Sequence, residues 1–218
     1  MKIINAGYQI LTPISPGGIE ELKHIERIGR ICYKSEDKIT EDGESAKKFV
    51  EGLIKRHHGA MLEHGSISVL FTVDRGVTHE LVRHRLASYA QESTRYCNYS
   101  GDKFGNELTF IKPCFWDEDS NHYKAWKDSM QYAEDVYLLM LKYGASPQEA
   151  RSILPNSIKA DITMTANYRE WRHILNLRAA GTTGKPHPQM SEVMVPLLKE
   201  LQSKIPVLFD DIEVQYEA

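Results

Sequence analysis

The 218-residue chain lacks several features that would place it in a specialised class of protein. It has only three cysteines, Cys32, Cys97 and Cys114, and no Cys-x-x-Cys spacing, so neither a disulfide framework nor a thiolate zinc site is expected. No apolar run approaches the roughly 18 residues that span a bilayer, and the N-terminus lacks the apolar core of a signal peptide. We therefore expect a soluble, cytoplasmic protein with no membrane partner.

The chain also has no large excess of acidic or basic side chains. The 27 basic and 30 acidic side chains give a formal charge of -3, and the pI is near 6.3. Such a molecule has no general attraction to nucleic acid, so any anion that it binds must be met by local charge. A Gly-x-Gly-x-x-Gly fingerprint is missing too, which argues against a Rossmann crevice for a dinucleotide.

Alternating and periodic apolar residues predict a mixture of strands and helices. Strands are predicted at residues 2–11, 66–73, 108–111 and 158–166; helices are predicted at 19–31, 45–58, 76–87, 117–143, 167–180 and 189–203; loops are predicted at 34–43, 89–101 and 181–188. Ser45 and Asn167 are expected to cap helices, and Ser146-Pro147-Gln148-Glu149 matches a capping box at the start of a short helix carrying Arg151. The order of elements predicts an α+β fold, with residues 1–218 in a single domain.

Residues 83–95, Arg-His-Arg-Leu-Ala-Ser-Tyr-Ala-Gln-Glu-Ser-Thr-Arg, concentrate anion-binding groups as no other part of the chain does. Arg83 and Arg85 bracket a histidine at a predicted helix end, and side chains two residues apart on a helix serve different faces. Guanidinium groups bind phosphate oxygens in pairs, and Ser93 with Arg95 adds a hydroxyl and a further guanidinium. The segment predicts a phosphate-binding loop. A solvated basic helix end is the alternative for Arg-His-Arg alone.

This segment resembles the pattern Arg-His-Arg-x-x-Ser-x-Asn-x-x-Ser-x-Arg of flavin-dependent thymidylate synthases. Six of the seven defining positions match, namely Arg83, His84, Arg85, Ser88, Ser93 and Arg95. Ala90 stands where the pattern has asparagine, so the polar contact made there in the family is missing or is replaced, for example by Gln91.

Further segments extend the resemblance over nearly the whole chain. They are residues 58–64, similar to His-x-x-x-x-Glu-His; residues 150–155, similar to Ala-Arg-x-x-Leu-Pro; residues 167–178, similar to the Asn-x-Arg-Glu and Leu-Arg pattern; and residues 187–189, similar to His-x-Gln. In the first of these segments Ala60 replaces a serine or threonine that often touches flavin, so that side-chain contact is lost and only a backbone amide remains to donate.

The resemblance implies a homotetramer with shared active sites, each subunit having a central, mostly antiparallel sheet flanked by helices. It implies reductive methylation of dUMP to dTMP, with methylenetetrahydrofolate as one-carbon donor, FAD as hydride carrier and NADPH as reductant of the flavin. The residues that it implies in dUMP binding are Glu80, Arg83, Gln91, Glu92, Ser93, Thr94, Arg95, Arg151 and Arg178. Those that it implies in FAD binding are His58, Arg83, His84, Arg85, Leu86, Gln91, Asn167, Arg169, His173 and His187.

Methylation at C5 of uracil requires that carbon to become nucleophilic. An enzyme achieves this by adding a thiolate to the ring or by stabilising negative charge on it. The resemblance assigns the second role to Arg178, whose guanidinium, facing N3 and the carbonyl edge, would favour the enolate-like form. The protein then needs no nucleophile of its own, and FAD carries the hydride chemistry.

Two other functions are open on the sequence. A thymidylate synthase with a cysteine nucleophile would use Cys97, two residues beyond Arg95, but the surrounding pattern of that family is missing, and a half-buried thiol is expected. A platform for single-stranded nucleic acid would combine the arginines with Tyr89, Tyr96 and Tyr99. The acidic pI argues against the platform.

A zinc site is the remaining alternative. His57, His58, Glu63 and His64 are close in sequence, but their spacing is not His-Glu-x-x-His and no predicted helix aligns them. We expect packed or hydrogen-bonded histidines and no metal.

Overall fold

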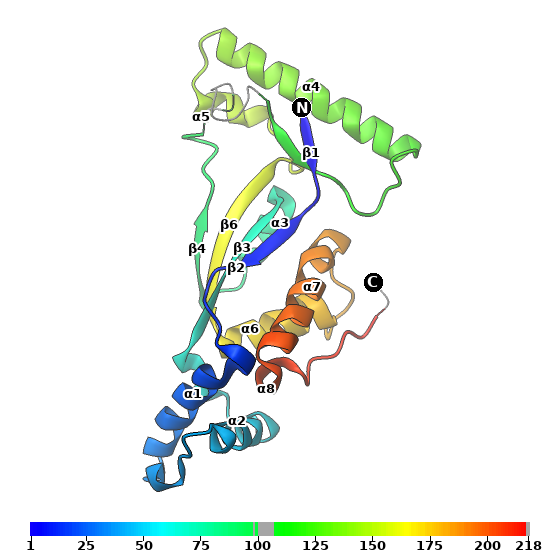
Figure 1. The fold of residues 1–218 in the computed structure, drawn as a ribbon. Helices are drawn as coiled ribbons and strands as arrows, with labels where there is room; N and C mark the ends of the chain where they lie inside the picture. The colour runs from blue at the N-terminus through cyan, green and yellow to red at the C-terminus, as the bar shows by residue number, and fades with distance from the viewer. Residues whose placement is uncertain (98, 100–106, 217–218) are drawn as a thin grey trace. The chain divides into compact units, whose positions relative to one another are not determined.

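The computed structural model describes residues 1–97, 99 and 107–216 (Figure 1). The strands are β1 (Lys2–Ile4), β2 (Gly7–Ile10), β3 (Ser66–Asp74), β4 (Ala87–Gln91), β5 (Thr109–Ile111) and β6 (Lys159–Asn167). The α-helices are α1 (Ile19–Ile31), α2 (Glu44–Lys55), α3 (Arg75–Leu81), α4 (Asn121–Lys142), α5 (Pro147–Ala150), α6 (Tyr168–Leu175), α7 (Pro188–Lys204) and α8 (Pro206–Phe209). Shorter helical turns are η1 (Pro16–Gly18), η2 (Glu36–Lys38), η3 (Gly59–His64), η5 (Arg151–Ile153) and the π-helical turn η6 (Asn176–Ala180).

These elements confirm the predicted α+β class with an antiparallel sheet and helices. The four-stranded sheet has the order β2-β3-β6-β4, and a separate parallel pair joins β1 to β5 with Ile3 opposite Phe110. Residues along β3 and β6 alternate between buried and partly exposed, as predicted for half-buried strands. In the described part of the chain, no helix is both long and apolar enough to cross a membrane.

The prediction of one strand over residues 2–11 is wrong. The chain forms β1 and β2 instead, and these strands belong to different sheets. Apolar residues continue through both strands, so the pattern alone does not mark the break between Ile4 and Gly7.

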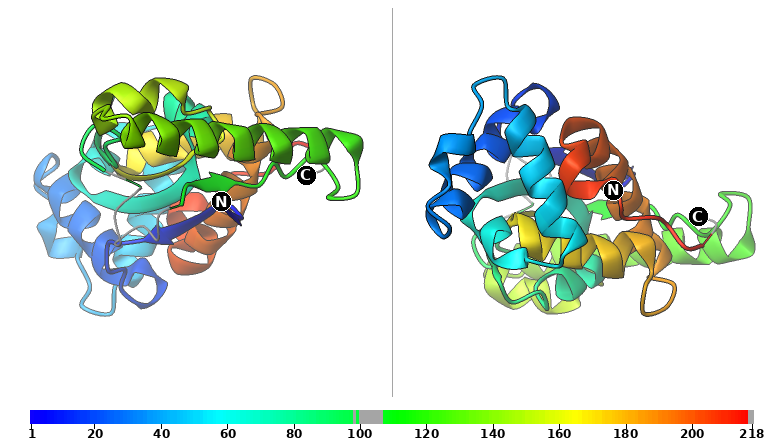
Figure 2. Two further views of the ribbon diagram at one scale, coloured as in Figure 1. Left: turned by 90° about the horizontal axis from the view of Figure 1, so that it is seen from above. Right: turned by 90° about the horizontal axis from the view of Figure 1, so that it is seen from below.

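The chain divides into two compact units. Unit 1 comprises Met1–Tyr8, Leu70–Arg83 and Tyr89–Thr163, and unit 2 comprises Gln9–Val69, His84–Ser88 and Met164–Ala218. In unit 1, α4 lies alongside β1 and β5 (Figures 1 and 2). Phe110 and the fully buried Tyr137 belong to the apolar core there. The buried Glu134 of α4 accepts a hydrogen bond of 2.7 Å from the backbone amide of Leu108, which attaches the helix to the segment that leads into β5.

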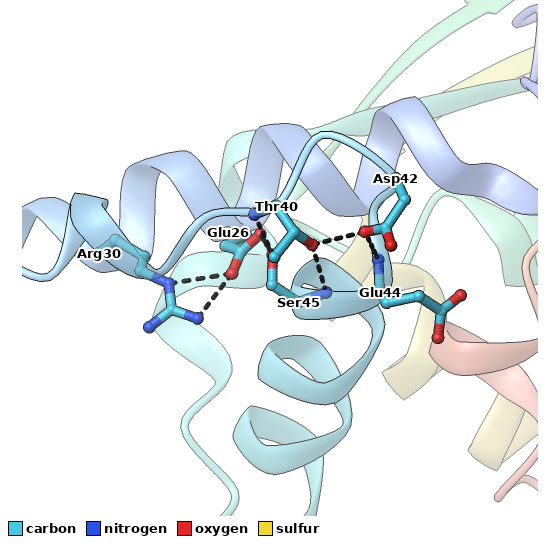
Figure 3. Close-up of polar contacts among 6 residues, drawn as sticks. All are labelled: Glu26, Arg30, Thr40, Asp42, Glu44 and Ser45. Atoms are coloured by element: carbon cyan, nitrogen blue, oxygen red, sulfur yellow. Dashed lines mark hydrogen bonds and ion pairs between the residues drawn. The ribbon is translucent and has the colours of Figure 1, made fainter.

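In unit 2, α1 and α2 pack side by side and are joined by a polar network (Figures 1 and 3). The fully buried carboxylate of Glu26 accepts hydrogen bonds from Nε and Nη2 of Arg30, at 2.9 and 2.7 Å, and from Oγ of Ser45 at 2.8 Å. Ser45 is therefore not the helix cap that we predicted. The cap of α2 is Gly43, whose φ of 80° lies in the left-handed region that glycine adopts at little cost.

The predicted helix over residues 76–87 is wrong beyond Leu81, where α3 ends. Val82 and Leu86 fit a helical spacing but are 43% and 70% exposed, and the chain enters β4 at Ala87. Pairing of β4 with β6 therefore overrides the local helical pattern. For the same reason the loop predicted at 89–101 begins as a strand, and its positions 98, 100 and 101 lie outside the described residues.

Candidate active site

Helix α6 carries polar side chains of the candidate site and is held firmly in unit 2. Asn167 caps the helix as predicted, because its side chain accepts a hydrogen bond of 2.8 Å from the amide of Glu170. Trp171 is fully buried and donates a hydrogen bond of 2.9 Å from Nε1 to the carbonyl of Ile67 in β3. The helix continues into the π-helical turn η6, which carries Arg178. Such turns are rare and often occur at functional sites.

A chain of three polar groups lies in unit 2. Arg178 donates a hydrogen bond of 3.2 Å from Nε to Nε2 of His84. On the other side of the imidazole, Nδ1 of His84 lies 3.9 Å from Oε1 of Glu170. His84 and Glu170 are only 6% and 8% exposed, so the structure buries an imidazole between a carboxylate and a guanidinium.

The exposed His173 is next to these three polar groups, one helical turn after Glu170. Its ring meets that of His84 edge-on, with 6.3 Å between the centroids. One ligand atom each from His84, Glu170 and His173 lie within 4.8 Å of one another. Tetrahedral zinc with bonds of about 2.0–2.1 Å requires ligand atoms roughly 3.4 Å apart. Because Arg178 also uses Nε2 of His84, the geometry favours a row of polar groups over a metal centre, with one hydrogen bond to Arg178 and one longer contact to the Glu170 carboxylate.

A cavity of about 410 Å³ in unit 2 brings other predicted flavin residues together. His58 and Arg169 line it, with Ala60 and the rings of Tyr33 and Phe49. Of the remaining flavin candidates, Arg85 and Leu86 are exposed in the turn that precedes β4, and His187 caps α7, where its ring Nδ1 accepts a hydrogen bond of 3.3 Å from the amide of Gln189. Next to the cavity, Arg169 pairs with Glu63 over 2.6 Å, and both side chains are about half exposed.

In unit 1, the predicted phosphate-binding segment 83–95 continues beyond β4 as an irregular loop. Gln91 donates a hydrogen bond of 3.1 Å to Oγ1 of Thr78 on α3. Oγ of Ser93 accepts a hydrogen bond of 3.3 Å from the amide of Arg95, whose guanidinium lies 5.3 Å from the ring centroid of Tyr96. The other predicted nucleotide residues of unit 1 are the half-buried Glu80, the buried Thr94, and the exposed Arg83 and Arg151.

Glu92 is held by its protein neighbours. Its carboxylate accepts hydrogen bonds from Tyr99 at 2.9 Å, from Nζ of Lys159 at 2.8 Å, and from the amide of Asp161 at 3.3 Å. Burial lowers the pKa of Lys159, but the hydrogen bonds to Asp161 and Glu92 outweigh this and raise it. Burial, reinforced by the Glu92 carboxylate, raises the pKa of the Tyr99 phenol. Glu92 thus anchors the start of the loop to β6.

The sequence reasoning missed Lys159 and Asp161, and it named Glu170 in the Asn-x-Arg-Glu pattern without giving it a role in the site. The signal for the first two was a pair of charged residues two apart in a strand, which places both on the face opposite the buried Ala160 and Ile162. The signal for Glu170 was a Glu-x-x-His spacing on a helix, which stacks the two side chains on one face.

The residues predicted to bind dUMP and those predicted to bind FAD lie mostly in different units. All residues implied in dUMP binding belong to unit 1 except Arg178. All residues implied in FAD binding belong to unit 2 except Arg83 and Gln91. The sequence reasoning did not anticipate this separation.

Comparison with known proteins decides the family. Residues 19–207 match the family model described as thymidylate synthase complementing protein. The flavin-dependent thymidylate synthase of Corynebacterium aurimucosum is 31% identical over 217 residues, covering 92% of this chain and 84% of that protein. The chain belongs to the flavin-dependent thymidylate synthase family. The resemblance inferred from residues 83–95 is confirmed, and with it the classification of the chain as an enzyme of this family.

Other flavin-dependent thymidylate synthases are similar at comparable levels. That of Corynebacterium glutamicum is 30% identical over 88% of this chain and 79% of its own length. Among solved structures, a UMP/dUMP methylase PolB from Streptomyces cacaoi superimposes with a TM-score of 0.77 at 20% identity, covering 96% of both chains. The roles of individual residues in this member of the family stay predictions.

Proposed function

We propose that this chain methylates dUMP to dTMP, with methylenetetrahydrofolate as the one-carbon donor and FAD, reduced by NADPH, as the hydride carrier. The observation that carries the proposal is the placement of Arg178 on a π-helical turn, hydrogen-bonded to the buried His84, in a chain of this family. The description of the similar PolB fold as a UMP/dUMP methylase supports a pyrimidine nucleotide as substrate.

The phosphate of the nucleotide would be bound by unit 1. Ser93 and Arg95 follow β4, and Arg151 begins the turn η5. The hydrogen bond from the amide of Arg95 to Ser93 holds the two residues in a compact turn, which reduces the entropy lost when a phosphate binds. Guanidinium groups suit this ligand because their paired donors match phosphate oxygens.

The flavin dinucleotide would be bound by unit 2. The cavity lined by His58 and Arg169 combines basic groups with the aromatic rings of Tyr33 and Phe49, a combination that suits a phosphate next to a planar ring. Glu63 holds Arg169 at the rim. When bound, FAD supplies the hydride that converts the transferred one-carbon unit to a methyl group.

Arg178 would activate the uracil ring. Its positive charge would stabilise the negative charge that develops on the carbonyl edge as C5 becomes nucleophilic. The alternative nucleophile, Cys97, is half-buried and packs against the apolar core that contains Tyr99 and Tyr137. A thiol packed in this way behaves as a small apolar side chain, which supports activation without an enzymic nucleophile.

We also propose that the chain assembles as a homotetramer with shared active sites. Tyr132, Val136, Leu139 and Tyr143 form a stripe along α4 at helical spacing, and Tyr132, Leu139 and Tyr143 are 69%, 44% and 77% exposed. An apolar stripe of this kind suits burial against another copy of the chain.

The decisive experiment is turnover by the purified protein. Incubation of dUMP with methylenetetrahydrofolate, NADPH and FAD should yield dTMP, measured by chromatography, and the protein should show the visible absorption of bound flavin. A protein that neither binds FAD nor forms dTMP would contradict the proposal. Binding of single-stranded oligonucleotides by a flavin-free protein would favour the nucleic-acid platform instead.

A further inference from the structure

The side chains of Glu170, His84 and Arg178 lie in a row in unit 2. The role inferred for this row rests on the proposed function. Glu170 belongs to α6 and Arg178 to η6, so the two ends of the chain are on consecutive helical segments. His84 comes from the segment after α3, 94 positions away from Arg178, and its ring connects the two ends.

The hydrogen bond between Arg178 and His84 defines the protonation of the imidazole. A guanidinium only donates, so Nε2 of His84 must carry a lone pair to accept from Nε of Arg178. The imidazole is then neutral and its proton is on Nδ1, the nitrogen that faces Oε1 of Glu170 at 3.9 Å. A carboxylate in this position stabilises that tautomer.

We propose that Glu170 and His84 are positioning residues for Arg178. Glu170 selects the Nδ1–H tautomer of His84, and His84 in turn holds the guanidinium plane through Nε. This bond uses Nε and not the terminal amino groups, which are the donors that suit a carbonyl edge. Burial of Glu170 and His84 strengthens the chain, because polar interactions are stronger where water is excluded.

The contacts of Glu170 and His84 explain how Arg178, one arginine among many, is oriented before substrate binds. An unrestrained arginine loses side-chain entropy when it binds a ligand, whereas Arg178 is already oriented by a partner that is itself fixed. Asn167 adds to this, because its cap bond to the amide of Glu170 fixes the first turn of α6 from which the carboxylate extends. We therefore expect loss of Glu170 to act on the rate of methylation rather than on nucleotide affinity.

Substitution of Glu170 tests the proposal, because its effect on flavin reduction can be compared with its effect on dTMP formation. Reduction of FAD by NADPH does not require uracil activation, whereas formation of dTMP does. Glu170→Ala should lower kcat for dTMP about tenfold with KM for dUMP and the rate of flavin reduction nearly unchanged, which is the scale seen for residues that orient a functional group. Glu170→Gln keeps an acceptor oxygen and should recover part of the loss.

A matched control is available at a carboxylate that pairs with the same helix. Asp211→Asn removes a carboxylate that pairs with Arg172 of α6. Asp211 is not one of the three groups Glu170, His84 and Arg178, so this variant should keep kcat within about twofold of the parent. The proposal is overturned if Glu170→Ala retains the parent kcat, or if it slows flavin reduction and methylation equally, which would indicate general damage to the fold.

The tautomer of His84 gives a test that does not depend on activity. In protein labelled with ¹⁵N-histidine, the ring signals that disappear in His84→Gln belong to His84. They should show a protonated Nδ1 and an unprotonated Nε2, and Glu170→Ala should alter this pattern. A parent protein with Nε2–H, or an imidazolium at neutral pH, would refute the positioning chain. Absence of dTMP formation by the parent protein would refute the proposed function instead.

Discussion

Arg178 donates a hydrogen bond from Nε to Nε2 of His84 across 3.2 Å, although the two residues are 94 positions apart in sequence. The bond joins the two sequence segments that carry the family resemblance most strongly. Its consequence is that His84 is a partner of the proposed catalytic arginine, in addition to any contact that it makes with flavin.

Arg178→Ala should strongly reduce methylation while flavin binding persists. Loss of one charge-stabilising donor typically costs about 3–4 kcal/mol, so kcat should fall roughly 100- to 1000-fold. Arg178→Lys, which keeps the charge but not the Nε–H donor, should also be strongly impaired. The measurements are dTMP formation and the visible flavin spectrum of the same samples. Normal turnover by Arg178→Ala would remove this residue from the mechanism.

Cys97→Ala should leave the activity within about twofold of the parent, because the thiol packs against an apolar core and has no assigned part in the chemistry. Initial rates of dTMP formation measure this directly. A loss of several orders of magnitude would mean that the cysteine attacks the ring, and the flavin-only mechanism would then be wrong.

Asp211→Asn should reduce stability at neutral pH but not in acid. The hydrogen bonds from Arg172 lower the pKa of Asp211 below its usual value, which is about 3.9 in an unfolded chain. The pair therefore stabilises the fold above that value, and its contribution is lost as pH falls through the lower pKa of the folded state.

Urea unfolding at several pH values checks this. The difference in free energy of unfolding between parent and Asp211→Asn should be constant above about pH 5 and should shrink below about pH 4. Asp210→Asn, at the neighbouring exposed carboxylate, is the control and should show little difference. A difference for Asp211→Asn that persists unchanged in acid would exclude the ion pair as its cause.

His57→Gly should raise stability by about 0.5–1 kcal/mol, since His57 has a left-handed backbone that a side chain disfavours. Its φ is 56°, and it follows the end of α2, where its amide donates to the carbonyl of Ile54 over 2.9 Å. Arg56→Gly, at a residue with φ of -94°, should destabilise. Urea midpoints measure both variants. A lower midpoint for His57→Gly would show that the imidazole makes a compensating contact.

Leu139→Lys should disrupt self-association, because it places a charge in the middle of the apolar stripe of α4. Sedimentation analysis should show species smaller than a tetramer. Gln131→Lys, at an exposed position of α4 away from the stripe, should leave the assembly intact. An unchanged tetramer in Leu139→Lys would place the subunit interface elsewhere.

Much of the local structure could be predicted because it depends on nearby residues. The alternation in β3 and β6 marks the buried face of each strand, and Asn167 and the Ser146 capping box satisfy amides within three positions of themselves. The family could be recognised for a related reason, since binding of phosphate and flavin concentrates particular residue types at particular spacings.

Other features depend on partners that are distant in sequence. The end of α3 at Leu81 follows from pairing of β4 with β6, and the anchoring of Glu92 follows from Lys159 on that same strand. The separation of the predicted nucleotide and flavin residues into two units was likewise invisible in the sequence.

The sequence by itself determined the family, because the Arg-His-Arg segment and the stretch that ends at Arg178 are recognisable from residue type and spacing alone. The tertiary structure alone decided how they act on one another. A hydrogen bond needs atoms within about 3 Å and in the right orientation, and only folding brings His84 between Glu170 and Arg178.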